Sequence, residues 1–153
     1  MDQQFILQVV GIGAALLLFA ILAWAALRAG RRHSRRDNAF DQMEGHEFER
    51  FCAHLLKQRG FVEVEVTRGS GDFGVDVLAE KDGVTYAVQC KRYDAPVGVK
   101  AVQEACAGRE YYDRMVGAVM TNQYFTQPAV EAAKRLKILL WDRGYMESMM
   151  EEE

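Results

Sequence analysis

An uninterrupted apolar stretch from Phe5 to Leu27 constrains this chain more than any other feature of its sequence. These 23 residues carry no charge, and Gln8 is the one polar side chain among them. As an α-helix the stretch would measure about 34 Å, enough to cross the apolar layer of a bilayer. We therefore expect residues 5–27 to form a transmembrane helix. The alternative is a cleaved secretory signal, but such signals carry positive charge before a shorter apolar core, and here Met-Asp-Gln-Gln comes first.

Residues 28–39 form a basic linker after this stretch, with five arginines between positions 28 and 36. Positive residues that flank a membrane helix stay on the cytoplasmic side. We therefore expect a single-pass membrane protein whose C-terminal domain lies in the cytoplasm. The same arginines could instead bind nucleic acid or anionic lipid headgroups.

The remainder of the chain is long enough for one domain, and this domain is acidic. From Asp37 onward there are 14 Lys and Arg residues against 21 Asp and Glu residues, a net charge of −7. Such a domain is not a general polyanion binder, so any contact with nucleic acid needs a local basic patch or metal ions. The three cysteines are odd in number and lack C-x-x-C spacing, which indicates neither a disulfide framework nor a zinc site.

Periodicity after residue 40 predicts alternating helices and strands. Helices are expected at 45–59, 99–112 and 126–136, and strands at 61–67, 75–80, 84–91, 115–121 and 137–141. Asp82-Gly83 is a typical hairpin turn, and a strand, helix, strand succession predicts crossover connections. We therefore expect an α/β fold with a mixed central sheet flanked by helices. The domain is expected to cover residues 40–146, followed by an acidic tail at 147–153.

Polar residues interrupt the second and third predicted strands, where a fold would ordinarily place apolar ones. Because side chains alternate along a strand, Gln89 and Lys91 share one face while Val88 and Cys90 share the other. The hairpin brings Asp76 alongside them. A carboxylate, an amide oxygen and an ammonium group suit Mg²⁺-assisted hydrolysis of a phosphodiester.

A second carboxylate for the metal is expected from the first helix. Glu49 lies at the edge of its buried face, and Glu47 is the alternative. The residues expected to contact DNA phosphates are Arg68, Arg92 and Lys100. Asp72 in the glycine-rich loop either stabilises the turn or reaches the metal.

Three segments together resemble the catalytic domain of Mrr-type restriction endonucleases, within the PD-(D/E)xK nuclease superfamily: GHEFE at 45–49, GSGDFGVD at 69–76 and QCKRY at 89–93. The resemblance covers about residues 45–142 and implies a restriction-endonuclease-like αβββαβ core. It implies Asp76, Gln89 and Lys91 as the catalytic core, with Glu49 and the backbone carbonyl of Cys90 as further metal ligands. It also implies DNA cleavage that depends on Mg²⁺, with Mn²⁺ as a substitute. In that branch a glutamine replaces the usual second acidic residue, as Gln89 does here.

Together, anchor and resemblance predict a nuclease of the bacterial inner membrane that acts on DNA as a homodimer, since one such site cuts one strand. Defence against foreign DNA is the expected role. Proteins of this type commonly carry a separate DNA-recognition domain, whose place the anchor takes here. The alternative is a noncatalytic membrane-bound scaffold or nucleic-acid-binding protein that keeps the nuclease fold. A nuclease for branched DNA is a further variant, which the acidic charge balance disfavours.

Overall fold

The computed structural model describes residues 17–21, 40–67 and 73–151. The chain divides into two units, residues 1–39 and residues 40–153. In the first unit residues 17–21 are helical, and the rest of the expected transmembrane segment 5–27 and the linker 28–39 lie outside the described residues. In the part of the chain that is described, no helix is both long and apolar enough to cross a membrane.

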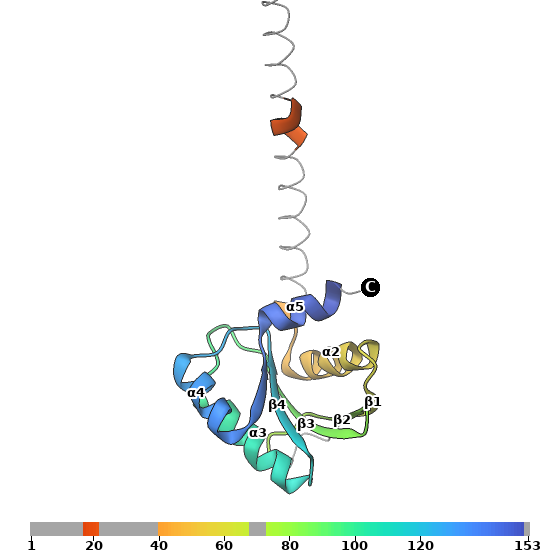
Figure 1. Ribbon diagram of the computed structural model, residues 1–153, viewed down its shortest axis with the longest axis vertical. Helices are drawn as coiled ribbons and strands as arrows, with labels where there is room; N and C mark the ends of the chain where they lie inside the picture. The colour runs from red at the N-terminus through yellow and green to blue at the C-terminus, as the bar shows by residue number, and fades with distance from the viewer. Residues whose placement is uncertain (1–16, 22–39, 68–72, 152–153) are drawn as a thin grey trace, which may run out of the picture. The chain divides into compact units, whose positions relative to one another are not determined.

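The second unit is built on one mixed sheet of five strands (Figure 1). The strands are β1 (Val62–Val66), β2 (Val77–Lys81), β3 (Val84–Lys91), β4 (Val116–Thr121) and β5 (Ile138–Trp141). They lie in sequence order, with β1, β2 and β3 antiparallel and β3, β4 and β5 parallel. The mixed α/β architecture predicted from the sequence is therefore confirmed.

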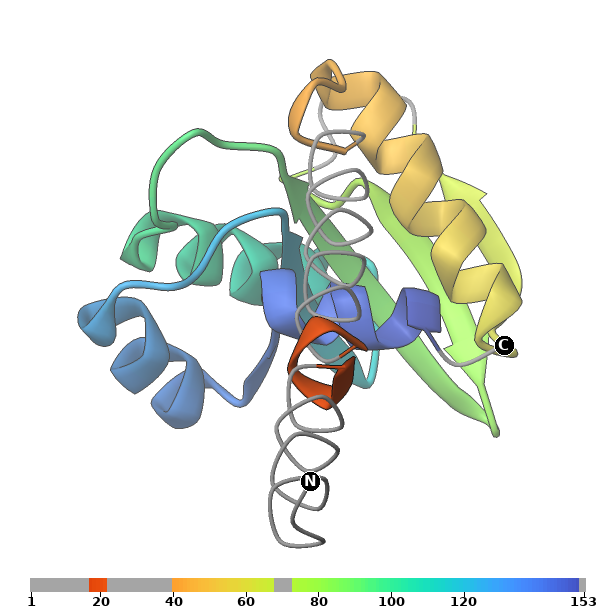
Figure 2. The ribbon, with the colours of Figure 1, turned by 90° about the horizontal axis from the view of Figure 1, so that it is seen from above.

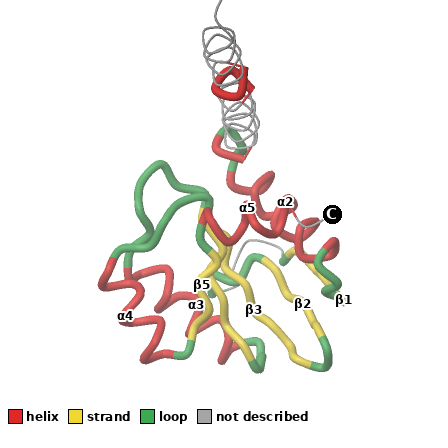
Figure 3. The backbone as a smooth tube through the Cα atoms, turned by 45° about the horizontal axis from the view of Figure 1, so that its top comes forward, coloured by secondary structure: helices red, strands yellow, loops and turns green. Residues whose placement is uncertain are grey.

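Helices cover both faces of this sheet (Figures 2 and 3). They are α2 (Gly45–Gln58), α3 (Val99–Tyr111), α4 (Gln127–Leu136) and α5 (Arg143–Glu151). One apolar cluster joins α2 and α5 to the sheet and includes Phe48, Leu56 and Met146. A second cluster joins α3 and α4 to the opposite face and includes Val102, Val119 and Ala129. The sheet is thus the middle layer of three.

Local sequence signals explain where the helices begin and end. In α2 the backbone N–H of Glu44 donates to the Glu47 carboxylate at 3.1 Å, so Glu47 caps the helix. The chain leaves α2 through Gly60, whose φ of +80° suits a residue without a Cβ. In α4 the Thr126 hydroxyl accepts the N–H of Ala129, and Pro128 occupies the first turn.

The β2–β3 hairpin determines which strand ends meet. Asp82 and Gly83 both have positive φ, 52° and 77°, as a two-residue turn of the primed type requires. The register pairs Val77 with Val88. As a result the residue before β2, which is Asp76, lies beside the last residues of β3.

The chain ends differently from the prediction. All eight predicted helices and strands are present within two residues of their expected bounds, but α5 follows them. The boundary expected at residue 146 falls inside α5, and Met149 on this helix is buried. Residues 147–151 are therefore helical and packed on the sheet, and the expected acidic tail at 147–153 is corrected over that range.

Candidate active site

Asp76 is held at the end of β3 by its own side chain. Its backbone N–H donates to the carbonyl of Val88 at 2.9 Å, and its Oδ2 accepts the N–H of Cys90 at 2.6 Å. The carboxylate thus occupies a place that a backbone carbonyl would have in a regular antiparallel ladder. This contact fixes the carboxylate against the strand that carries the other expected site residues.

Gln89 and Lys91 share a face of β3, as the alternation predicted. Both contact Glu104 of α3: Gln89 donates from Nε2 to Oε2 at 2.8 Å, and Lys91 Nζ lies 2.9 Å from the same oxygen. Val88 and Cys90 pack in the opposite cluster, against α2. Sequence reasoning had not identified Glu104.

The charge of Glu104 is stabilised by its neighbours. Partial burial would raise the pKa of Glu104, but hydrogen bonds from Lys91 and Gln89 and the charges of Lys91 and Lys100 together lower it below its ordinary value. The one local signal was Lys100, four residues earlier, because that spacing suggests an exposed ion pair on a helix. The contact with β3 depends on how α3 docks, which no local pattern encodes.

Glu49 approaches the same end of β3 from α2. Its Oε2 lies 3.0 Å from Nδ1 of His46, and its side chain is 17% exposed while that of His46 is 78% exposed. The hydrogen bond and negative charge of Glu49 raise the pKa of His46, and the charge of Asp76 adds to this effect. Glu47, the alternative to Glu49, is used in capping the helix.

The pKa of the Cys90 thiol is affected by both carboxylates, Asp76 and Glu49. Its buried thiol has a pKa raised well above the ordinary value by a hydrogen bond with the Cys52 thiol and by burial, and the charges of Asp76 and Glu49 raise it further. The negative charges of Asp76 and Glu49 therefore raise the pKa of the same two groups, Cys90 and His46. The end of β3 has Glu49 on the α2 side of the sheet and Glu104 on the α3 side.

Two glycines allow the segment before β2 to pack closely on α3. A Cβ on Gly74, whose φ is +80°, would lie 2.8 Å from Gln89 Nε2 and 3.2 Å from Glu104 Cβ. A Cβ on Gly108 would lie 2.2 Å from Val75 Cγ2. These close approaches hold residues 73–76, and Asp76 with them, against the helix that carries Glu104.

The three residues expected to contact DNA have different surroundings in the structure. Arg68 lies outside the described residues, as do Asp72 and the glycines at 69 and 71. Arg92 donates to the carbonyl of Asp41 and pairs with Asp94 at 3.1 Å, which ties it to the fold. Lys100 is 87% exposed and lies 3.6 Å from Glu104, so its ammonium group faces solvent beside the site.

The residues present fit a divalent metal ion of the magnesium type. Gln89 is 1% exposed, and its Oε1 is buried with no hydrogen-bond partner among the described residues. A buried amide oxygen without a partner is costly, and a cation would satisfy it. Across the described ranges, no group of three or more His, Cys, Asp and Glu residues suits a metal. Mg²⁺ needs only one or two carboxylates, because waters and substrate oxygens complete its shell.

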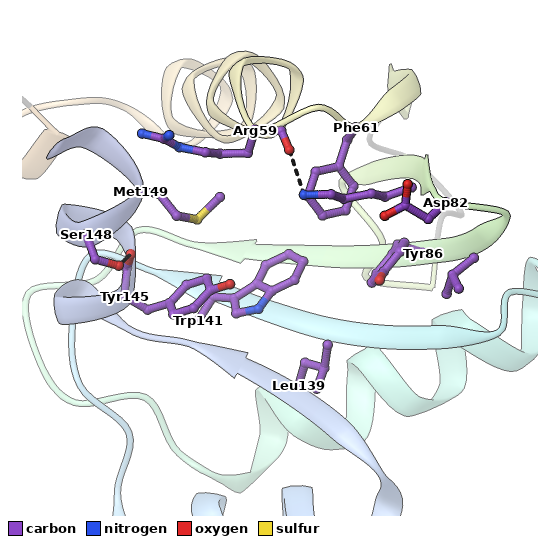
Figure 4. A pocket seen from close by; sticks show the side chains of 11 residues that line it. Arg59, Phe61, Asp82, Tyr86, Leu139, Trp141, Tyr145, Ser148 and Met149 are labelled. Atoms are coloured by element: carbon purple, nitrogen blue, oxygen red, sulfur yellow. Dashed lines mark hydrogen bonds between the residues drawn. The ribbon is translucent and has the colours of Figure 1, made fainter. Parts of the chain in front are cut away.

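A pocket of about 470 Å³ lies elsewhere, at the hairpin end of the sheet under α2 and α5 (Figure 4). Its wall includes Phe61, Tyr86, Trp141 and Tyr145. Lys81 also lines it and donates to the carbonyl of Arg59 at 2.8 Å, as the dashed line in Figure 4 shows. None of the sequence-predicted site residues that the structure describes lines this pocket, and Asp76 lies beside Cys90 at the opposite end of β3.

Solved structures share this fold. A protein of unknown function, AF1548, is 26% identical with a TM-score of 0.56, over 67% of this chain and 63% of its own. The DNA modification-dependent restriction endonuclease AspBHI is 17% identical with a TM-score of 0.56, over 74% of this chain and 34% of its own. The MspJI restriction endonuclease, solved in complex with a 27-mer oligonucleotide, is 18% identical with a TM-score of 0.52, over 76% of this chain and 29% of its own.

The chain spans less than two thirds of the length of each of these three structures. None of the curated proteins matches it. The family model Mrr_cat, described as restriction endonuclease, matches residues 40–150, which is more than half of the chain. The chain therefore belongs to the Mrr_cat restriction endonuclease family.

Proposed function

We propose that this protein is an Mrr-type endonuclease that hydrolyses DNA phosphodiester bonds with Mg²⁺, or with Mn²⁺ in its place. Membership of a restriction endonuclease family supports a nuclease. The observation that carries the metal dependence is the buried Oε1 of Gln89, which has no hydrogen-bond partner in the described part of the chain and lies on the strand whose end holds Asp76 and Lys91. Asp76, Gln89, Glu49 and the backbone carbonyl of Cys90 would hold the ion.

The metal ion, Lys91 and Lys100 would have separate roles in the hydrolysis. Bound Mg²⁺ would polarise the phosphate and lower the pKa of a coordinated water. Lys91, held in place by Glu104, would offset the negative charge that develops on the phosphate and orient the attacking water. Lys100, exposed at the start of α3, would contact a neighbouring phosphate.

Plasmid cleavage tests this proposal. The 153-residue chain, purified in mild detergent, is incubated with methylated and unmethylated supercoiled plasmid in Mg²⁺, in Mn²⁺ or in EDTA. We expect metal-dependent nicking, and a loss of about 100-fold or more in Lys91→Ala. Lys134→Ala, which alters an exposed residue of α4, is the matched control and should cleave normally. A folded protein that cuts none of these DNAs would favour a noncatalytic scaffold instead.

The proposal includes anchoring by residues 5–27 in the bacterial inner membrane, with the nuclease domain in the cytoplasm. Its support is the uncharged apolar stretch and the arginines after it. In membrane fractions washed with alkaline carbonate, the chain should stay in the pellet, and a variant without residues 5–27 should not. Recovery of both in the supernatant would refute the anchor.

We also propose that the protein acts as a homodimer in defence against foreign DNA, since cutting both strands needs two such sites. Light scattering in detergent gives the mass of the protein after subtraction of the detergent. A mass of two chains is expected, and a monomer that linearises plasmid in one encounter would contradict the dimer.

A further inference from the structure

The amide of Gln89 presents a problem of orientation. The amide oxygen and nitrogen are nearly identical in shape, but only the oxygen can bind a cation. Gln89 is 1% exposed, so its amide is shielded from bulk solvent and depends on neighbouring groups for hydrogen bonds. If a neighbouring group binds one of these two atoms, the other atom is left to face the metal site.

Glu104 removes this ambiguity. An ionised carboxylate only accepts hydrogen bonds, so the amide edge that faces it must be the Nε2 edge. The observed contact is Gln89 Nε2 donating to Glu104 Oε2 at 2.8 Å, and no described residue donates a hydrogen bond to Oε1. A flipped amide would set its oxygen against the carboxylate and lose this bond.

Cations around Glu104 keep it ionised and in place. Lys91 Nζ lies 2.9 Å from Oε2, and Lys100 Nζ lies 3.6 Å from Oε1. The close approach of Gly74, whose Cβ position is 2.8 Å from Gln89 Nε2, packs the amide from the loop side.

We propose that Glu104 is a positioning residue that fixes the Gln89 amide with Oε1 free for a divalent cation and Nε2 turned away from it. This inference rests on the metal-dependent function proposed above. A carboxylate can bind the metal in either rotation and needs no partner to orient it. The contact with Glu104 explains how a glutamine can act as a metal ligand at the same position. By the same contact Glu104 fixes the ammonium group of Lys91.

The test measures metal binding without DNA, by titrating Mn²⁺ and following the signal of free Mn²⁺ by electron paramagnetic resonance. Wild type, Asp76→Ala and Glu104→Gln are compared. In Glu104→Gln the amide at position 104 can both donate and accept, so Gln89 is free to flip. We expect its Mn²⁺ affinity to fall about 10- to 100-fold, the usual effect of losing a partner of a metal ligand.

A double variant separates positioning from a merely structural effect. Gln89→Glu combined with Glu104→Gln exchanges the carboxylate and the amide across the same hydrogen bond. It should recover most of the affinity lost in Glu104→Gln, because a carboxylate at position 89 needs no orientation. Glu110→Gln is the matched control on the same helix, since Glu110 is 70% exposed and pairs with Arg109. Its affinity should equal that of wild type.

Three results would overturn the inference. These are unchanged affinity in Glu104→Gln, no recovery in the folded double variant, or no Asp76-dependent Mn²⁺ binding in wild type. Plasmid cleavage is measured independently of the Mn²⁺ affinities. If wild type binds Mn²⁺ through Asp76 but cuts no DNA, the proposed nuclease function fails, while the affinities of the variants still decide the role of Glu104.

Discussion

His46 and Glu49 lie one helical turn apart in α2 and contact each other at 3.0 Å. Because the carboxylate favours the protonated ring, the pKa of His46 is raised above 6.5. We expect Glu49→Gln to lower the His46 midpoint, measured from the imidazole proton shifts by NMR. Glu131→Gln, at an exposed position of α4, should leave it unchanged.

The sign of the accompanying effect on stability follows from the raised pKa. The contact stabilises the fold fully below the ordinary histidine pKa, and its contribution is lost as pH rises through the raised value. An identical His46 midpoint in wild type and Glu49→Gln would show that Glu49 does not hold the ring.

Glu104 has the opposite pH dependence. Its pKa is lowered from about 4.5, so its contribution to stability is present above that pH and is lost as pH falls through the lowered value. We expect wild type to be more stable than Glu104→Gln near neutral pH, and the difference to shrink on acidification. Urea unfolding midpoints between about pH 7 and about pH 3 measure this. A difference that is constant over the range would contradict the expectation.

At the scale of secondary-structure elements, the close packing of α3 on the segment before β2 places Asp76. Gly108 permits this packing, since a Cβ there would lie 2.2 Å from Val75 Cγ2 and 3.3 Å from the carbonyl of Phe73. We expect Gly108→Ala to destabilise the fold by about 1–3 kcal/mol, as overpacking does. DNA cleavage should fall as well, because relief of the clash displaces Val75 and the adjacent Asp76.

Gly45→Ala is the matched control for this prediction. Gly45 is the first residue of α2, and a Cβ there would meet no atom of the described residues within 4 Å. This variant should keep both its stability and its activity. Normal urea unfolding and normal cleavage in Gly108→Ala would show that the segment before β2 tolerates the extra methyl group.

At the scale of the whole domain, a polar network joins the first residues of the fold to the last helix. Arg143 at the start of α5 contacts Asp41 with two nitrogens, at 2.8 and 3.2 Å. Buried Asn122, just after β4, donates to Asp41 at 2.8 Å and exchanges hydrogen bonds with the backbone of Tyr93. The network therefore also holds the chain just beyond Lys91.

We expect Asp41→Asn to destabilise the domain by about 1.5–3 kcal/mol, the usual contribution of hydrogen bonds to a charged group. The variant keeps the shape of the side chain but loses the charge that Arg143 pairs with. Thermal unfolding measures the change, with Asp113→Asn, at a turn residue between α3 and β4, as the control. An unchanged midpoint would show that the network adds little to stability.

Several features of the fold and site followed from local sequence alone. Apolar periodicity located the helices and strands, Asp82-Gly83 located the hairpin, and strand alternation put Gln89 and Lys91 on one face. Each of these depends on residues within a few positions of one another, where backbone geometry and side-chain periodicity decide the outcome. The last helix was missed although Asp142, which caps it, and the spacing of Met146 and Met149 were visible signals.

Only the tertiary structure decided which side chains become partners across the fold. Gln89 meets Glu104 at a separation of 15 residues, Arg92 meets Asp41 at 51, and Arg143 meets Asp41 at 102. Such pairs depend on how α3 and α5 dock on the sheet, through close approaches such as Gly108 against Val75. By itself the sequence determined the elements and the identity of the expected catalytic groups. The docking of the helices decided how the side chains of these catalytic groups are oriented, because a hydrogen bond between distant residues exists only once both elements are packed.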